Sequence, residues 1–194
     1  MIEKATVVII HGSYGSPNEN WFPWLAQEVR MIGHRAIVPS FPTPDGQDLK
    51  NWLNLFEIEV GPLRSDMVLV GHSLGPGLIL GLLERSQTPI IGTFLVSGFL
   101  GELGIDEFDS VNKSFVNRDF DWPAIRENAG KIYVYNSNND PYVPLEKGRE
   151  LAERLGTDVH VIDSGGHINA EAGYTEFRQL RDDLRSLLAP VPGR

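Results

Sequence analysis

The stretch that decides the fold is Val68-Leu69-Val70-Gly71-His72-Ser73-Leu74-Gly75-Pro76-Gly77. Its G-x-S-x-G pentapeptide, Gly71 to Gly75, follows an apolar run typical of a buried strand and precedes Leu78 to Leu83, an apolar run typical of a buried helix. A serine on so tight a turn has a strained backbone, and flanking glycines relieve the crowding. This context favours an exposed nucleophile, Ser73, over a structural turn with an incidental serine.

Similar apolar runs recur along the chain and alternate with segments of helical spacing. Continuous Val, Ile and Leu runs are typical of strands buried on both faces of a parallel sheet. The alternation predicts an α/β fold: one domain over residues 1–194, a three-layer sandwich with a mostly parallel sheet of about six strands and no large cap. The predicted strands are 5–10, 36–38, 67–70, 91–96, 131–136 and 158–162, and helical patterns lie at 21–32, 144–155 and around 174–187.

Composition excludes several classes of protein. The chain has 194 residues, a length that suits one domain, and its 17 basic against 26 acidic side chains argue against a nucleic-acid partner. It has no cysteine, which excludes disulfides, thiolate zinc sites and a cysteine nucleophile. No apolar run approaches the ~18 residues that cross a bilayer, and the start of the chain lacks a signal-peptide pattern. We therefore expect no membrane partner and a cytoplasmic location.

A serine nucleophile needs a base, and His167 is the best placed of the histidines. It follows the last predicted strand in a glycine turn, at the sheet edge where ligands collect in open α/β sheets. The orienting acid is expected on a loop at the same edge, where Asp140 follows the fifth strand. Asp163 is the rival, but it leaves the same strand as His167 and would have to fold back. The histidines are His11, His34, His72, His160 and His167.

A second glycine-bearing turn, His11 to Gly15, follows the first strand and predicts part of an oxyanion hole. The backbone N–H of Leu74, just after the nucleophile, is one expected donor, and that of Ser13 is favoured over Tyr14 as the second. The turn lacks the lysine and the spacing of phosphate-binding loops. We expect neither a cofactor nor a metal.

The substrate pocket and its cover are predicted from less specific signals. Candidate pocket residues are Tyr14, Trp21, Trp24 and His72, although aromatic packing that anchors the first helix explains the two tryptophans equally well. The connection 98–130 is long enough to be functional or to carry short helices, and it could act as a small lid. Its seven acidic residues predict an acidic rim that disfavours anionic substrates.

Several motifs together resemble the small α/β-hydrolase family of serine hydrolases that includes retinoblastoma-binding protein nine and the YdeN-like proteins. The resemblance covers nearly the whole chain and rests on His11-Gly12, Asn20-Trp-Phe-Pro-Trp-Leu25, Gly71-His-Ser-Leu-Gly75, Phe120-Asp-Trp-Pro-Ala-Ile125, Asn139-Asp-Pro-Tyr-Val-Pro144 and Gly165-Gly-His167. It implies a Ser73, Asp140 and His167 triad.

The expected function is that of a serine hydrolase, a carboxylesterase that acts on a small-molecule ester through an acyl-enzyme. A thioesterase or an amidase-peptidase would use the same triad. A non-catalytic interaction module that keeps the hydrolase fold is the alternative from another class, although the chain lacks the cysteine of an L-x-C-x-E peptide.

Overall fold

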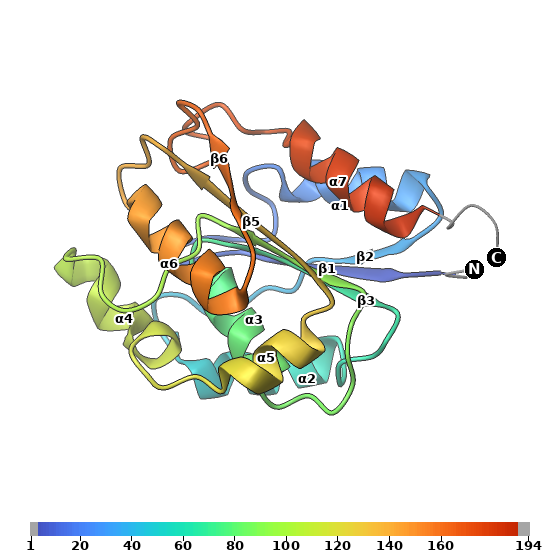
Figure 1. The fold of residues 1–194 in the computed structure, drawn as a ribbon, viewed down its shortest axis with the longest axis horizontal. Helices are drawn as coiled ribbons and strands as arrows, with labels where there is room; N and C mark the ends of the chain where they lie inside the picture. The colour runs from blue at the N-terminus through green and yellow to red at the C-terminus, as the bar shows by residue number, and fades with distance from the viewer. Residues whose placement is uncertain (1–3, 190–194) are drawn as a thin grey trace.

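Six apolar runs form one central sheet (Figure 1). The computed structural model describes residues 4–189. All neighbouring strands pair in parallel, in the order β2-β1-β3-β4-β5-β6. The predicted α/β fold with a parallel sheet of about six strands is therefore confirmed. The strands are β1 (Thr6–Ile10), β2 (Arg35–Ile37), β3 (Met67–His72), β4 (Gly92–Val96), β5 (Lys131–Ser137) and β6 (Val159–Ile162).

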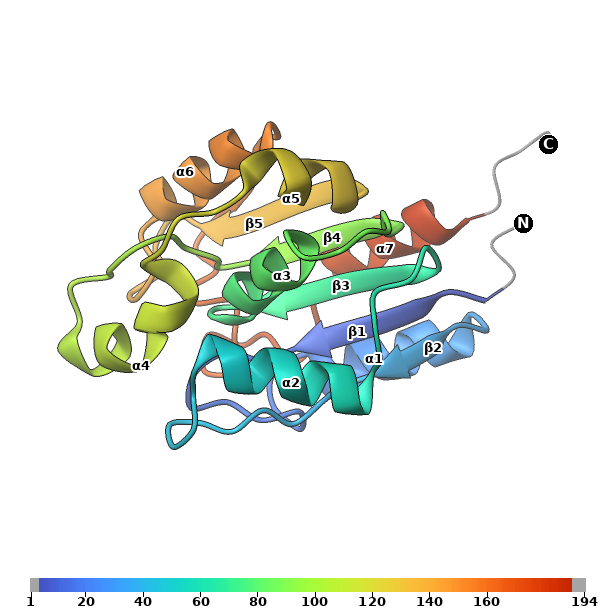
Figure 2. The ribbon, with the colours of Figure 1, turned by 90° about the horizontal axis from the view of Figure 1, so that it is seen from below.

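Helices cover both faces of the sheet, as Figure 2 shows from below. Side chains of α1 and α7 join the buried cluster on one face, and those of α2, α3, α5 and α6 join the cluster on the other. In the described part of the chain, every helix is too short or too polar to cross a membrane. The helices are α1 (Phe22–Met31), α2 (Leu49–Glu59), α3 (Gly75–Leu83), α4 (Asp106–Val116), α5 (Trp122–Asn128), α6 (Leu145–Leu155) and α7 (Arg178–Leu188).

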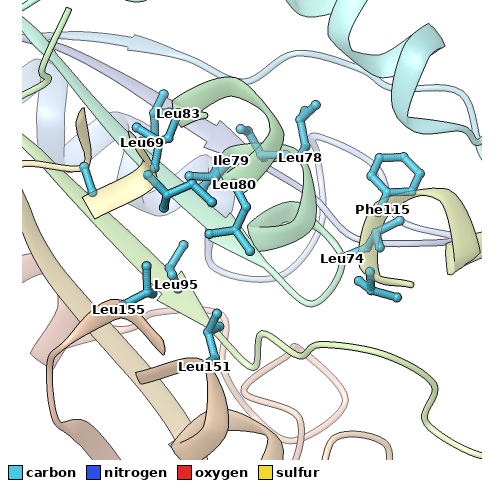
Figure 3. Close-up of a cluster of buried hydrophobic side chains, with 14 of the residues drawn as sticks. Leu69, Leu74, Leu78, Ile79, Leu80, Leu83, Leu95, Phe115, Leu151 and Leu155 are labelled. Carbon is cyan, nitrogen blue, oxygen red and sulfur yellow. The ribbon is translucent and has the colours of Figure 1, made fainter. Parts of the chain in front are cut away.

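Helix α3 lies at the centre of the larger cluster and fixes the turn that precedes it. Leu78, Ile79 and Leu83 are completely buried. Figure 3 shows them among the leucines of the neighbouring strands and of α6, including Leu69 and Leu95. Because a helix that is apolar on every side must be buried, this sequence positions α3 under the sheet, with its first turn beside the carboxyl end of β3.

The strand order reverses between β1 and β3. From β1 the chain passes outward to β2 and then returns to the other side of β1 as β3, before continuing through β4 to β6. In open α/β sheets a crevice forms at such a reversal, outside the carboxyl ends of the strands. The turns after β1 and β3, which contain Gly12 and Ser73, both lie at this point.

Two helices differ from the prediction: α7 begins later than expected, and α2 was not expected. The last helix begins at Arg178 rather than near Tyr174, because the backbone at Phe177 is not helical (φ −122°, ψ 81°) and its buried ring packs before the helix starts. The connection 98–130 carries α4 and α5, as its length allowed. Helix α2 was not predicted, although Asp48 caps it by accepting a hydrogen bond from the Asn51 backbone N–H at 2.9 Å.

Candidate active site

Ser73 occupies a strained turn between β3 and α3. Its φ of 58° lies in the left-handed region, which is rare for a residue with a side chain. The flanking glycines are required by close backbone contacts: a Cβ on Gly71 would lie 2.7 Å from the Pro76 nitrogen, and one on Gly75 would lie 2.6 Å from the Ile10 carbonyl oxygen. The G-x-S-x-G spacing thus reflects the room that the turn allows.

His167 and Asp140 meet beyond the carboxyl ends of β5 and β6. The His167 Nδ1–H donates to Asp140 Oδ2 at 2.8 Å, and the side chains are 10% and 0% exposed. This bond leaves Nε2 of a neutral His167 as a proton acceptor. The rival acid, Asp163, instead accepts a hydrogen bond from Asn138 Nδ2 at 2.7 Å.

The second oxygen of Asp140 is held by its own loop. Oδ1 accepts hydrogen bonds from the backbone N–H groups of Tyr142 at 2.9 Å and Val143 at 3.0 Å. Burial alone would raise the pKa of Asp140, but the hydrogen bond and charge of His167 and these two amides lower the pKa below its usual value. Asp140 is therefore an ionised partner that fixes the imidazole orientation.

Two buried rings donate hydrogen bonds to the backbone of the segment that carries His167. The His72 Nε2–H donates to the His167 carbonyl at 2.9 Å, and the Trp21 Nε1–H donates to the Ile168 carbonyl at 2.9 Å. Burial, together with the neighbouring His167, lowers the pKa of His72 to about 3, so its imidazole is neutral near pH 7. Both rings support the loop through its backbone.

The backbone N–H groups of Ser13 and Leu74, near Ser73, have no acceptor within residues 4–189. The Tyr14 N–H, by contrast, donates to Thr43 Oγ1 at 2.6 Å. The turn lies against Ser73, since a Cβ on Gly12 would be 2.7 Å from Ser73 Cβ. This arrangement favours Ser13 over Tyr14 as the second oxyanion donor.

A chain of polar contacts ties this turn to α4. Thr43 Oγ1, which accepts from Tyr14, donates to Gln47 Oε1 at 2.5 Å. Gln47 Nε2 then donates to Ser13 Oγ at 2.9 Å and to Asn112 Oδ1 at 2.8 Å. Ser13 Oγ closes the network with a 2.5 Å hydrogen bond to Asn112 Oδ1. The turn after β1 is thereby fixed to the long connection.

These groups surround a cavity of about 300 Å³. Of the predicted site residues, its lining includes Ser73, His167 and Ser13, together with Tyr14 and His72. Within the described part of the chain, no group of three or more acidic or histidine side chains could hold a metal ion. The site therefore offers a serine hydroxyl, an imidazole and backbone amides to a bound molecule.

The two predicted tryptophans lie outside this cavity, so the expectation that they line the pocket is corrected. Trp21 is completely buried and packs edge-on against Phe22 and Phe177. Trp24 lies on α1, with the Arg181 guanidinium 5.6 Å from its ring centroid. Both rings instead fit the other explanation of the sequence, which is aromatic packing that anchors the first helix.

The predicted acidic rim is also corrected. From the connection 98–130, the cavity is lined by Leu103, Phe108 and Asn112, and by none of that segment's acids. Acids at the N-terminal ends of its helices accept hydrogen bonds within the segment: Asp109, for example, accepts from the backbone N–H of Leu103 at 2.7 Å. The carboxylates at the cavity are Glu19 and Glu171, from other loops.

Sequence reasoning missed the polar groups of the cavity wall. Asn20 lies within a quoted motif, but Asn112 and Asn169 carried no local signal. Gln47, which lies outside the lining and donates to Asn112, carried none either. Gln47 and Asn112 lie 65 residues apart in the chain and meet only because α4 folds over the turn after β1. Such partners follow from tertiary placement, whereas Ser73 follows from a local turn.

A parallel sheet with a serine turn after β3 and a His–Asp pair beyond β5 and β6 defines an α/β-hydrolase fold. The crystal structure of the ydeN gene product of Bacillus subtilis is similar to this one, with a TM-score of 0.88 and 30% sequence identity. The match covers 96% of this chain and 100% of the ydeN chain. The structure of Est1E from Butyrivibrio proteoclasticus with ferulic acid bound covers 98% and 92%, at 13% identity and a TM-score of 0.73, a likeness of fold.

Residues 7–186 match the family described as serine hydrolase, and the chain belongs to this family. YdeN of Bacillus subtilis strain 168 is 32% identical over 186 residues, which are 93% of this chain and 94% of YdeN. Serine hydrolase RBBP9 of Rattus norvegicus is 27% identical over 189 residues, 97% of each chain. The expected family resemblance is confirmed.

Proposed function

We propose that this protein is a serine esterase that hydrolyses small carboxylic esters through an acyl-enzyme. In this proposal Ser73 is the nucleophile, His167 the general base and Asp140 the group that orients His167. The observation that carries the proposal is the 2.8 Å hydrogen bond from His167 Nδ1 to Asp140, because it leaves Nε2 as a base in the cavity that Ser73 also lines.

Acylation begins when His167 Nε2 takes the Ser73 hydroxyl proton and Ser73 Oγ forms a bond to the ester carbonyl carbon. The carbonyl oxygen becomes an oxyanion that accepts hydrogen bonds from the Ser13 and Leu74 backbone N–H groups, which have no other acceptor within residues 4–189. The C–O bond to the alcohol then breaks, and the alcohol leaves with the proton held by His167.

Deacylation repeats these steps with water. His167 Nε2 takes a proton from water, the hydroxide attacks the acyl carbon, and the bond to Ser73 Oγ breaks. Ser73 regains the proton and the carboxylic acid leaves. Asp140 stays ionised throughout and stabilises the imidazolium in each half of the reaction.

The same residues could act on a thioester or on an amide, because the oxyanion and the acyl-enzyme are common to all three reactions. An ester is preferred over an amide because expulsion of its alcohol depends less on protonation by His167 than expulsion of an amine does. We propose the whole chain as one hydrolase domain, in which the segment 98–130 covers one side of the cavity through Leu103, Phe108 and Asn112.

The test is stopped-flow hydrolysis of p-nitrophenyl butyrate by the wild type, by Ser73→Ala and by Ser16→Ala as a matched control. The proposal predicts a burst that approaches one p-nitrophenolate per chain, or steady turnover if deacylation is fast, in the wild type and in Ser16→Ala. Ser73→Ala should release p-nitrophenolate no faster than roughly 10⁻³ to 10⁻⁴ of the wild-type rate. Equal rates in Ser73→Ala and the wild type would contradict the proposal.

A further inference from the structure

Three asparagines line the cavity, and each already uses its side-chain oxygen within the protein. They are Asn20, Asn112 and Asn169. An asparagine amide has one acceptor oxygen and one NH₂ group with two donor hydrogens. If the oxygen is held by a protein donor, the orientation of the amide is fixed and the NH₂ group is left for a ligand.

Asn112 is fixed through the polar chain that begins at a backbone amide. Because the Tyr14 N–H must donate to Thr43, the Thr43 hydroxyl hydrogen is available for Gln47 Oε1, which makes Gln47 Nε2 the donor to Asn112 Oδ1. Asn112 is only 2% exposed, and its Nδ2 donates to no acceptor within residues 4–189. Asn112 Nδ2 is not among the buried side-chain atoms that lack a partner, and the residue lines the cavity, so this NH₂ group can donate to a ligand or to water there.

Asn20 and Asn169 are fixed by backbone amides directly. Asn20 Oδ1 accepts from the Ala170 N–H at 2.8 Å, and Asn169 Oδ1 accepts from the Ala172 N–H at 3.0 Å. A backbone N–H can only donate, so the oxygen assignment follows in both cases. Neither Nδ2 group has an acceptor in the described part of the chain. The cavity thus presents three oriented NH₂ donors.

The charged groups of the cavity decide which acceptors these donors suit. Glu19 and Glu171 line the cavity, and the described lining contains neither lysine nor arginine. A carboxylate on the ligand would be repelled by both side chains and would find no cationic partner. A neutral oxygen, such as that of a ketone, an amide or a second ester, accepts from NH₂ groups without this repulsion.

We propose that the cavity selects neutral esters that carry a second carbonyl oxygen, and that the asparagine NH₂ groups, Asn112 foremost, are specificity-determining donors to that oxygen. This inference rests on the proposed esterase function and names its substrate class. Plain alkyl esters leave the three donors to water, and carboxylated esters meet the two glutamates. The preferred substrate therefore has polarity without charge at a distance from the scissile bond.

Three p-nitrophenyl esters of equal chain length test the inference: the 6-oxoheptanoate, the heptanoate and the monoester of heptanedioate. About four or five methylene groups separate the extra group from the scissile carbonyl, so intrinsic reactivity is nearly constant, and hydroxide-catalysed rates correct the remainder. The wild type should show kcat/KM for the 6-oxoheptanoate roughly threefold to tenfold above the heptanoate, the range of one or two net hydrogen bonds. The heptanedioate monoester should fall below both.

Asparagine-to-aspartate variants test the NH₂ donor without removing the acceptor oxygen of the same side chain. Asn112→Asp, Asn20→Asp and Asn169→Asp each keep the oxygen that the protein uses and remove the NH₂ group. At least Asn112→Asp should bring the ratio of 6-oxoheptanoate to heptanoate close to one. Asn54→Asp, at an exposed position on α2, makes the same change in charge away from the cavity and should keep the wild-type ratio.

The ratio is formed within one protein, so a general loss of activity cancels. Equal kcat/KM for the ketone and alkyl esters in the wild type, or an unchanged ratio in Asn112→Asp, would overturn the inference while the esterase function stands. No hydrolysis and no fluorophosphonate adduct at Ser73 would overturn both. If Ser73 reacts but none of the esters turns over, protection of Ser73 by 6-oxoheptanamide no better than by heptanamide overturns the inference.

Discussion

Acid should destabilise this fold through one buried side chain, His72. Its Nε2–H donates to the His167 carbonyl at 2.9 Å, and the residue is 4% exposed between the turn after β3 and the loop that carries His167. Burial lowers the pKa of His72 to about 3 in the folded protein, against 6.5 for an unperturbed histidine. The perturbation is therefore a fall in pH, with His72→Gln as the variant that removes the titrating group and keeps an N–H donor.

These two pKa values give the direction and the size of the change in the free energy of unfolding with pH. Between pH 6.5 and pH 3 the unfolded chain binds a proton at this position that the folded chain does not bind, so stability falls as pH falls. The limiting slope is about 1.4 kcal/mol per pH unit. Integrated from pH 6.5 to pH 4.5, the contribution of His72 is roughly 2 kcal/mol lost. Burial also lowers the pKa of His11, but that residue is present in both proteins and its effect cancels.

The assay is urea unfolding of the wild type and of His72→Gln at pH 6.5, 5.5 and 4.5, at constant ionic strength. The wild type should lose about 2 kcal/mol more than the variant over this range, with similar m-values. Parallel losses in the two proteins would refute the reasoning, because they would mean that His72 is protonated in the folded state or that it is not buried there.

Three further predictions concern the acid, the turn after β1 and the core. Asp140→Asn should lower kcat for ester hydrolysis by roughly 10³- to 10⁴-fold, whereas Asp163→Asn should keep the wild-type rate; similar losses in both would contradict the assignment. Gly12→Ala puts a methyl group 2.7 Å from Ser73 Cβ and 3.1 Å from its Oγ, so the rate of ester hydrolysis should fall about 10²-fold, and an unchanged rate would refute this contact. Leu78→Ala should lower the free energy of urea unfolding by about 2–5 kcal/mol, since Leu78 is completely buried, whereas the exposed Met31→Ala should change it little.

The parts of the site that the sequence predicts are those that depend on local structure and on strand direction. The turn at Ser73 is encoded by its two glycines and by the apolar runs on either side. His167 and Asp140 are predicted because parallel strands bring all their carboxyl ends to one edge of the sheet. Residues far apart in the chain can be placed together on that ground alone.

The polar wall of the cavity is not predictable in this way. Asn112 reaches Ser13 only because α4 folds over the turn after β1, and no local pattern encodes that contact. Trp21 and Trp24, at the start of α1, show the opposite error: an aromatic side chain fits a pocket or a core equally well in a sequence, and tertiary packing placed Trp21 in the core. The start of α7 was misplaced for the same reason, because the apolar Phe177 suits either a helix face or an extended segment.

The most direct test of the central claim is covalent labelling of the nucleophile. The protein is treated with a fluorophosphonate and digested, and the adduct is located by mass spectrometry, with Ser73→Ala as the control. The account predicts one adduct per chain, on Ser73, and none in the variant. An unlabelled wild type, or an adduct that persists in Ser73→Ala, would contradict it.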